Sequence, residues 1–386
     1  MNKDVVVVGL GAAGSAALRA AARRGLDCLG IEQFGIAHDR GSSHGRSRLF
    51  RSGSSEGAEY VDLAARSRSL WGELEQETGE EIVTVVGGLT IASADSPLLA
   101  DVRSAMDARN LPYEVLDADD LRRRYPQHRI DDSDTGVLDP GTGVVRPELA
   151  IRLSVEAARA AGAEVRTGVS ATRITERAGG VDVRLSDGTT VSAAQVVVAA
   201  GAWTALLQPD YPVPLTVRRA VLSWFRPRSG AEDRFAPDVF PVFTRENTGE
   251  VSGWGAPIID EYGVKIGLHD QAGYEIDDPA ANDPRVAPWE LERVQAFCAA
   301  QFADLEPVAQ HPRGCMITLT PDERFAVGRV DARSRIVTLA ACSGHGFKHS
   351  AAVGELGVQI ALDEQPFIDP TPFDPTRYTR KKEAVQ

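Results

Sequence analysis

The stretch Val5-Val6-Val7-Val8-Gly9-Leu10-Gly11-Ala12-Ala13-Gly14 decides the fold class of this chain. Its four valines predict a buried β-strand, and the Ala-rich residues 15–24 that follow predict a helix. The glycines allow a tight turn and a close backbone approach to a pyrophosphate, while the free N–H groups at the helix N-terminus attract phosphates. The order of strand, turn and helix therefore predicts a Rossmann-type α/β unit that binds a dinucleotide.

An acidic residue supports the dinucleotide interpretation. The second predicted strand, residues 27–31, is followed at once by Glu32, eighteen residues after Gly14. A carboxylate at this position accepts hydrogen bonds from the ribose hydroxyls of an adenosine and disfavours a 2′-phosphate. The alternative is a Gly-rich turn in an ordinary α/β domain. Strand, turn, helix, strand and acid within about 30 residues favour the cofactor site.

Length, charge and cysteine content narrow the class of protein. The chain has 386 residues, long enough for two domains, and a net charge of -13, which argues against nucleic acid and anionic membranes as partners. Its four cysteines, Cys28, Cys298, Cys315 and Cys342, show neither disulfide-framework nor zinc spacing. No stretch reaches the ~20 apolar residues of a membrane span. We therefore expect a soluble cytoplasmic protein without a metal centre.

The pattern of elements predicts two domains that alternate along the chain. Apolar runs typical of parallel-sheet strands recur at 195–200 and 336–341, whereas the region after residue 212 is rich in short, irregular strands. The discontinuous Rossmann-type domain is assigned residues 1–82, 144–211 and 321–386. An inserted α+β substrate domain, built on a mainly antiparallel sheet, is assigned residues 83–143 and 212–320. Helices are predicted for residues 60–78, 96–109, 117–125, 148–161, 288–303 and 348–362.

A polar loop follows Glu32. Residues 35–57 are too polar for a core and include Gly41-Ser42-Ser43-His44-Gly45-Arg46-Ser47-Arg48-Leu49-Phe50-Arg51. A flexible backbone with hydroxyl and cationic side chains can contact phosphate and polar ring atoms, so we predict that this loop lies along the cofactor. The alternative is a solvated surface loop. Three arginines within six residues are hard to explain on such a loop.

Several separated motifs add a family resemblance from Val5 to about Leu362. They are the glycine turn with Glu32, the form His-Gly-x-x-Arg-x-x-Arg at 44–51, Lys-Ile-Gly-Leu-His at 265–269, Cys315-Met316, and Ser-Gly-His-Gly-Phe-Lys at 343–348. With these motifs in this order, the chain resembles the monomeric sarcosine oxidase and N-methyltryptophan oxidase family of flavin-dependent amine oxidases.

The resemblance implies FAD, bound covalently through a thioether from Cys315 to the flavin 8α-methyl group. Read without the resemblance, Cys315 is a small buried hydrophobe, the commonest fate of a free cysteine. The N–H groups of the helix predicted after Gly346 can stabilise negative charge on such a flavin when it is reduced; the alternative is a plain capping loop. The implied cofactor-binding residues are Gly9, Gly11, Ala12, Ala13, Gly14, Glu32, Gln33, Ser42, His44, Arg48, Gly201, Trp203, Cys315, Met316, Gly344, Gly346, Phe347 and Lys348.

The resemblance further implies roles for the charged residues of these motifs. Arg51 and Lys348 are the expected pair for a substrate carboxylate, since Arg offers a planar fork and Lys a second positive point. Lys265 and Arg48 are expected against the flavin, where the lysine promotes reduction of oxygen. His269 and His345 are expected to tune the site or hold substrate, not to bind a metal.

The implied reaction is hydride transfer from the carbon attached to nitrogen, which gives an imine that water hydrolyses, while O2 is reduced to H2O2. Ile317 and Trp254 stand where sarcosine oxidases carry tyrosines, so the substrate is expected to be bulkier than sarcosine or a cyclic imino acid. The alternatives are a dehydrogenase of the glycine and D-amino-acid oxidase superfamily with noncovalent FAD, and a noncatalytic flavin-binding module. The expected partners are a small amine and O2, and the expected state is a monomer.

Overall fold

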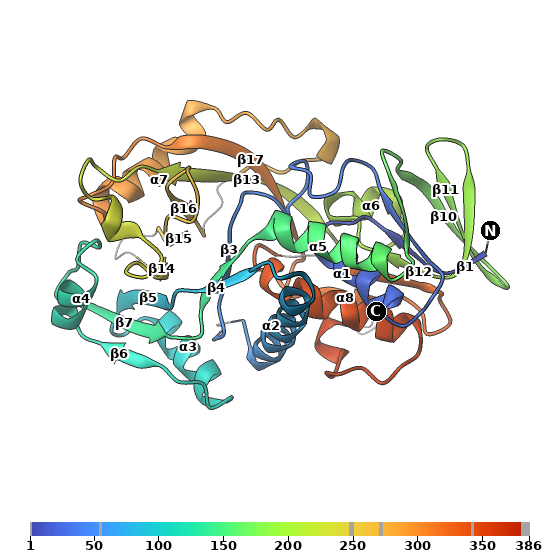
Figure 1. Ribbon diagram of the computed structural model, residues 1–386, viewed down its shortest axis with the longest axis horizontal. Helices are drawn as coiled ribbons and strands as arrows, with labels where there is room; N and C mark the ends of the chain where they lie inside the picture. The colour runs from blue at the N-terminus through green and yellow to red at the C-terminus, as the bar shows by residue number, and fades with distance from the viewer. Residues whose placement is uncertain (1, 54–55, 247–250, 270–272, 341–342, 380–386) are drawn as a thin grey trace.

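The computed structural model describes residues 2–53, 56–246, 251–269, 273–340 and 343–379. Two large β-sheets lie toward opposite ends of an elongated molecule, and the long strands β13 and β17 extend from one end to its middle (Figure 1). The helices α1, α2, α5 and α8 gather beside the first sheet. Cys342 and Ala341, parts of a predicted loop and strand, lie outside the described residues.

The first sheet contains the predicted dinucleotide unit. Its order is β10-β11-β12-β1-β2-β9, with β19 paired to β12 and β18 to β19, and β9, β2, β1, β12 and β19 run parallel. Its strands are β1 (Asn2–Val8), β2 (Cys28–Glu32), β9 (Glu164–Thr167), β10 (Ala171–Arg177), β11 (Gly180–Leu185), β12 (Thr190–Val198), β18 (Ala326–Gly328) and β19 (Ile336–Ala340).

The valines of β1 bury both faces of this sheet, because successive side chains point to opposite sides of a strand. Val5 and Val7 pack with Leu18 under the helices, whereas Val6 and Val8 pack in a second cluster on the other face. The helices of this region are α1 (Ala12–Ala22), α2 (Ala58–Thr78), α5 (Pro147–Ala160), α6 (Thr204–Leu207) and α8 (Ser350–Ala361).

The second sheet has the order β17-β13-β16-β15-β14-β5-β7-β6. Its pairs are antiparallel apart from β14 with β5. Its strands are β5 (Gly88–Ser93), β6 (Glu114–Leu116), β7 (Asp134–Asp139), β13 (Thr216–Phe225), β14 (Val242–Arg245), β15 (Gly253–Ala256), β16 (Val264–Leu268) and β17 (Gln310–Leu319), and its helices are α3 (Pro97–Asp107), α4 (Ala118–Arg124) and α7 (Pro288–Gln301). Phenylalanines 225, 235, 240, 243 and 302 form much of the core beneath it. This arrangement confirms the predicted fold class.

A small sheet joins the two regions. Its central strand β8 (Gly143–Val145) pairs with β3 (Arg48–Phe50) on one side and β4 (Val83–Val85) on the other. The strands of the two large sheets fall within the segments assigned to the two domains, but this small sheet combines residues from both assignments. The exact domain boundaries therefore stay a prediction.

Local details differ from the sequence prediction. The apolar run at 83–91, which by itself predicts one strand, is interrupted at Gly87, where φ is +76°, and forms β4 and β5. Strand β17 was not predicted around Cys315, because its sequence does not alternate regularly. The last helix begins at Ser350 and is preceded by a 3₁₀ turn over Phe347–His349.

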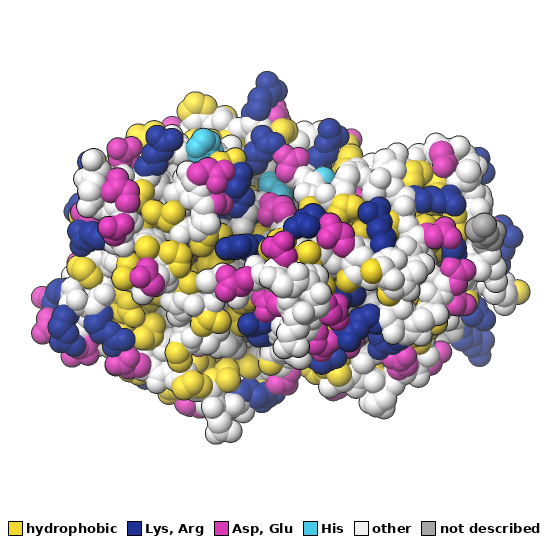
Figure 2. Space-filling model, in the orientation of Figure 1, with side chains coloured by type: hydrophobic (Ala, Val, Ile, Leu, Met, Phe, Trp, Pro, Cys, Tyr) yellow, Lys and Arg dark blue, Asp and Glu magenta, His cyan; other side chains and the backbone are white. Residues whose placement is uncertain are grey.

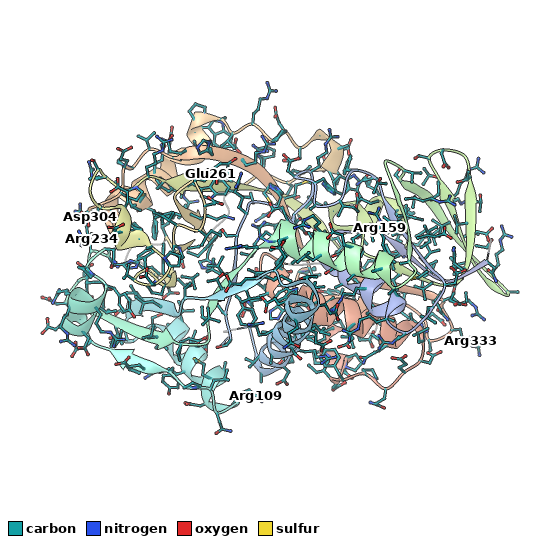
Figure 3. The ribbon with its side chains drawn as sticks, in the orientation of Figure 1. Arg109, Arg159, Arg234, Glu261, Asp304 and Arg333 are labelled. Carbon is teal, nitrogen blue, oxygen red and sulfur yellow. The ribbon has the colours of Figure 1, made fainter. Side chains whose placement is uncertain are left out.

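The surface carries both signs of charge. On the face shown in Figure 2, acidic and basic side chains are interspersed. At the end of the molecule occupied by the second sheet, Arg234 and Asp304 lie side by side and form an ion pair (Figure 3). Among the described helices, none is long and apolar enough to cross a lipid bilayer.

Candidate active site

A cavity of about 990 Å³ is lined by both large sheets. Three predicted site residues, Gly14, His44 and Lys265, do not line it. The cavity brings together the other predicted residues, namely Gly9, Gly11, Ala12, Ala13, Glu32, Gln33, Ser42, Arg48, Arg51, Gly201, Trp203, Trp254, His269, Cys315, Met316, Ile317, Gly344, His345, Gly346, Phe347 and Lys348. Their individual roles stay predictions, but one cavity contains segments that are more than 300 residues apart in sequence.

The glycine turn is shaped as a dinucleotide site requires. Gly9 has a φ of +88°, and a Cβ there would lie 2.5 Å from the Ala199 oxygen. A Cβ on Gly14 would lie 1.8 Å from the Gly9 oxygen, so this glycine lets helix α1 pack against the turn. The turn thus brings the N-terminus of α1 to the cavity, where Ala12 N donates to the Ser43 hydroxyl at 3.2 Å and a phosphate could take the place of that hydroxyl.

Glu32 is fixed at the end of β2. Its carboxylate accepts hydrogen bonds from Leu10 N at 2.9 Å and Phe34 N at 3.0 Å, and His38 Nε2 lies 3.3 Å from it. Burial alone would raise the pKa of Glu32, but these contacts outweigh it and lower the pKa. Glu32 therefore remains an ionised acceptor at the place where a ribose is expected, and these residues fit a dinucleotide.

One face of the second sheet forms the middle of the cavity. Ala220 on β13 lies opposite Cys315 on β17, and Arg218 lies opposite Ile317 two residues along. Because side chains alternate along a strand, these four residues share one face. The Cys315 thiol is buried in this wall, 3.9 Å from the Gly41 oxygen. The predicted loop 35–57 thus passes beside this cysteine.

Lys265 lies behind the cavity wall. Its Nζ donates to the carbonyl oxygens of Gly45 at 2.7 Å and Ser47 at 2.8 Å, and the side chain is 1% exposed. The rings of Trp224 and Trp254 lie 5.2 Å and 5.8 Å from Nζ. Burial, followed by the charge of Arg48, lowers the pKa of Lys265 well below its ordinary value. The resemblance predicted that this lysine lies against a flavin. In the structure its Nζ contacts the backbone turn of residues 45–47.

The two cations expected to hold a carboxylate already contact one. Glu56 Oε1 lies 2.8 Å from Lys348 Nζ and 3.1 Å from Arg51 Nη2, and His345 Nδ1 is 3.8 Å away. Burial would raise the pKa of Glu56, but Lys348, Arg51 and His345 hold the pKa well below its usual range. The cluster therefore binds a carboxylate group, here supplied by the protein itself.

Sequence reasoning missed Glu56. A signal was present, since it is the acid nearest to Arg51 in a loop otherwise rich in cations. Its partner Lys348 is 292 residues away, so the contact could not be read from local sequence.

The charge of Lys348 gives this cluster a pH dependence. Burial lowers the pKa of Lys348 to about 8, against the opposing effect of Glu56. The lysine is charged below this pH and loses its charge as the pH rises through it. We expect the affinity for propionate, a carboxylate without an amine, to fall by about tenfold above pH 8, measured from the perturbed flavin absorbance. Lys348→Met should bind propionate weakly without this step; an equal step in the variant would contradict the assignment.

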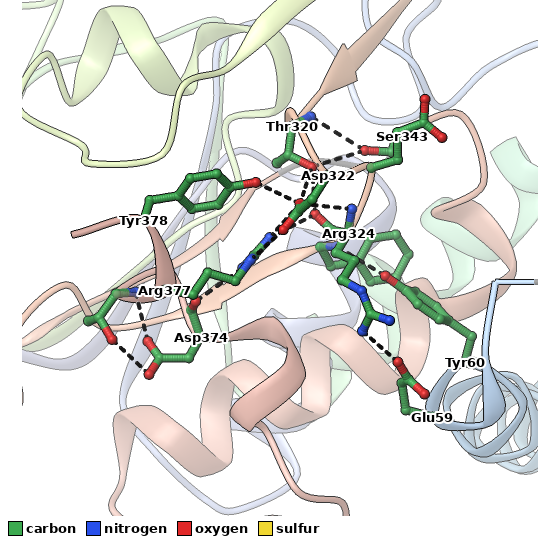
Figure 4. A network of polar contacts seen from close by, with 12 residues as sticks. Glu59, Tyr60, Thr320, Asp322, Arg324, Ser343, Asp374, Arg377 and Tyr378 are labelled. Carbon is green, nitrogen blue, oxygen red and sulfur yellow. Dashed lines mark hydrogen bonds and ion pairs between the residues drawn. The ribbon is translucent and has the colours of Figure 1, made fainter. Parts of the chain in front are cut away.

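A polar network holds the loop that carries His345 (Figure 4). Asp322 accepts hydrogen bonds from Tyr378 at 2.6 Å and from Arg377 at 2.9 Å, while Thr320 Oγ1 lies 3.5 Å from Ser343 Oγ. His345 Nε2 lies 3.2 Å from the Glu323 oxygen. The C-terminal segment therefore binds the loop between β17 and β18, and that loop contacts His345 in the segment that precedes α8.

Apolar and neutral groups complete the wall near the cation cluster. The Trp254 ring lies over Gly267, where a Cβ would approach it to 2.4 Å. Desolvation at the cavity wall lowers the pKa of His269 and of His345 to about 4 each, so both imidazoles are neutral at neutral pH. In the described part of the chain, no group of three or more His, Cys, Asp or Glu could hold a metal ion. The site can thus bind an anion beside an aromatic wall.

Comparisons with known proteins agree with this geometry. A protein-family model described as DAO, FAD dependent oxidoreductase, matches residues 4–360. Monomeric sarcosine oxidase of Streptomyces avermitilis is 35% identical over 377 residues, which cover 97% of each chain. N-methyl-L-tryptophan oxidase of Yersinia pestis (strain Pestoides F) is 31% identical over 380 residues, which cover 98% of this chain and 100% of the relative.

Solved structures of lower identity share the fold. NikD, an unusual amino acid oxidase essential for nikkomycin biosynthesis, has a TM-score of 0.83 at 23% identity and covers 97% of both chains. L-proline dehydrogenase from P.horikoshii has a TM-score of 0.83 at 20% identity and covers 98% of both chains. The family resemblance read from the sequence motifs is confirmed. The chain belongs to the DAO family of FAD dependent oxidoreductases, in the same group as monomeric sarcosine oxidase and N-methyl-L-tryptophan oxidase.

Proposed function

We propose that this protein oxidises the C–N bond of an N-methylated or other secondary amino acid to an imine and reduces O2 to H2O2. The carboxylate-binding cluster of Arg51 and Lys348 at the cavity carries this proposal. Bound FAD supplies the chemistry, since it accepts a hydride from the substrate and passes electrons to O2. Water then hydrolyses the imine.

The residues of the cavity suit the binding of such a substrate. Its carboxylate would replace that of Glu56 between Arg51 and Lys348, which fixes the orientation of the reacting carbon. The neutral imidazoles of His269 and His345 allow an uncharged amine nearby without adding positive charge. An uncharged amine is required, because a protonated nitrogen has no lone pair to support the departing hydride.

We expect the substrate to be bulkier than sarcosine or to be a cyclic imino acid. Trp254 and Ile317 both line the cavity and provide apolar surface where a hydroxyl group would offer hydrogen bonds. The purified holoenzyme should form peroxide with members of a panel of N-methyl amino acids and cyclic imino acids. Absence of peroxide, with flavin reduced anaerobically by the same amines, would favour a dehydrogenase. Absence of both reactions would contradict the proposed function.

We propose a covalent bond between Cys315 and the FAD. The thiol lies in the cavity wall beside Gly41, on the face that also carries Ala220. After acid precipitation, the yellow flavin should stay with the wild-type protein, whereas Cys315→Ala should release it into the supernatant. Cys298→Ala is the matched control, since this thiol is buried in the core away from the cavity. Flavin retained by Cys315→Ala, or released by the wild type, would contradict the bond.

A further inference from the structure

The turn formed by residues 45–47 is held from two sides. On one side, Glu148 in the first turn of α5 accepts hydrogen bonds from Gly45 N at 2.7 Å and from Arg46 N at 3.0 Å. On the other side, the carbonyl oxygens of Gly45 and Ser47 accept from Lys265 Nζ at 2.7 Å and 2.8 Å. The Glu148 carboxylate therefore binds N–H groups of this turn, and the Lys265 ammonium binds its carbonyl oxygens.

This turn has an unfavourable backbone conformation. Gly45 has a φ of +102° and Arg46 a φ of +64°, which is uncommon for a residue with a side chain. A Cβ at position 45 would lie 2.4 Å from Leu222 Cδ1 and 3.2 Å from Lys265 Nζ. Such a conformation persists only when its surroundings hold it in place. The hydrogen bonds to Glu148 contribute to that restraint, together with those from Lys265.

The surroundings of Lys265 make its positive charge costly. Burial and the guanidinium of Arg48 lower its pKa, while Glu148, Cys315 and Asp260 oppose this effect. His44 also faces this region and is neutral, since burial lowers its pKa to about 3. Asp260 reaches this turn through the side chain of Arg46, 3.8 Å away, whereas Glu148 binds the backbone of the turn whose carbonyl oxygens contact Nζ.

We propose that Glu148 is a positioning residue that holds the turn at 45–47 and thereby keeps the Lys265 ammonium charged and fixed beside the cavity. This inference rests on the proposed oxidase function, in which Lys265 assists reduction of O2. A fixed positive charge stabilises the anions that form as oxygen is reduced. An acid in the first turn of a helix also interacts favourably with the helix dipole, so the test must separate these two roles.

The charge of Lys265 can be measured directly by NMR. The chain contains only five lysines, so ¹³C labelling of the lysine side chains gives a simple spectrum in which Lys265→Met assigns the signal. In Glu148→Gln holoenzyme, Lys265 should lose its proton at a pH about one unit lower than in wild type. Glu261→Gln is the control, because Glu261 pairs with Arg46 at 3.1 Å from the solvent side and is 68% exposed (Figure 3). An unchanged Lys265 titration in Glu148→Gln would overturn the proposal.

Reoxidation provides a second readout that needs no substrate. Enzyme reduced with dithionite is mixed with O2 across a range of pH. The fast reaction should be lost at a pH about one unit lower in Glu148→Gln than in wild type. Glu148→Asp keeps the charge but shortens the side chain, so it should lower the rate without moving the pH profile as far. Where Lys265→Met reoxidises more slowly than wild type, identical profiles for wild type and Glu148→Gln would also overturn the proposal.

The two measurements distinguish this inference from the proposed function. If wild type and Lys265→Met reoxidise equally fast, the role of Lys265 in oxygen reduction fails. The NMR titration still decides whether Glu148 controls the charge of Lys265. If amines fail to reduce the flavin, the proposed function fails while both measurements on Glu148 remain interpretable.

Discussion

Lys265→Met should slow the reaction of the reduced enzyme with O2 by about 10²- to 10³-fold, the usual effect of removing one group that stabilises a developing anion. The side chain is fully enclosed, with Nζ held by two carbonyl oxygens between two tryptophan rings. Methionine fills a similar volume without charge, so the fold should tolerate it. Stopped-flow measurement after dithionite reduction gives the reoxidation rate.

Anaerobic reduction of the same variant by substrate should change far less. Lys348→Met is the matched control, since Lys348 is the other lysine buried at the site and lies in the carboxylate cluster. It should weaken substrate binding and leave reoxidation near the wild-type rate. Equal loss in both half-reactions of Lys265→Met would contradict a role specific to oxygen.

Arg51→Gln should lower kcat/KM for an N-methyl amino acid by about 10²- to 10³-fold, since loss of one partner of a buried charge pair costs about 2–5 kcal/mol. Arg51 Nη2 lies 3.1 Å from Glu56, and the side chain lines the cavity with only 16% exposed. The two residues that follow Arg51, Ser52 and Gly53, donate hydrogen bonds to the carboxylate of Asp139. These bonds fix the backbone next to Arg51. Steady-state peroxide formation measures the effect.

A substrate without a carboxylate separates binding from chemistry. The corresponding N-methyl amine should be a poor substrate for the wild type and lose little further activity in Arg51→Gln. Arg109→Gln is a matched control, since Arg109 pairs with Asp62 on the surface and does not line the cavity. A similar loss for both substrates would mean that Arg51 acts on something other than the carboxylate.

The sequence predicted the parts of the site that local chemistry determines. The glycine turn, Glu32 and the order of strand and helix follow from backbone rules that act over a few residues. The cations Arg51 and Lys348 were found through motifs, and the structure places both beside one cavity. These residues could be identified because a dinucleotide site needs glycines and an acid, and a carboxylate site needs cations.

The parts that were missed depend on contacts between distant segments. Glu56 meets Lys348 across 292 residues, and Glu148 meets Gly45 across 103. No periodicity records such a pairing, because an isolated acid in a polar stretch usually faces solvent. The position of Lys265 behind a turn was missed for the same reason, since strand β16 and the loop before β3 come together only in the folded chain.

The small sheet of β3, β4 and β8 has a mechanical consequence. Strands β4 and β8 carry the chain between the two large sheets, and Arg51 follows β3 directly. A hinge motion that separated the large sheets would strain these ladder hydrogen bonds, and a Cβ at Gly143 would lie only 2.2 Å from the Thr84 oxygen. We therefore expect this small sheet to oppose separation of the two large sheets, so that ligand exchange proceeds by local movement of the cavity wall.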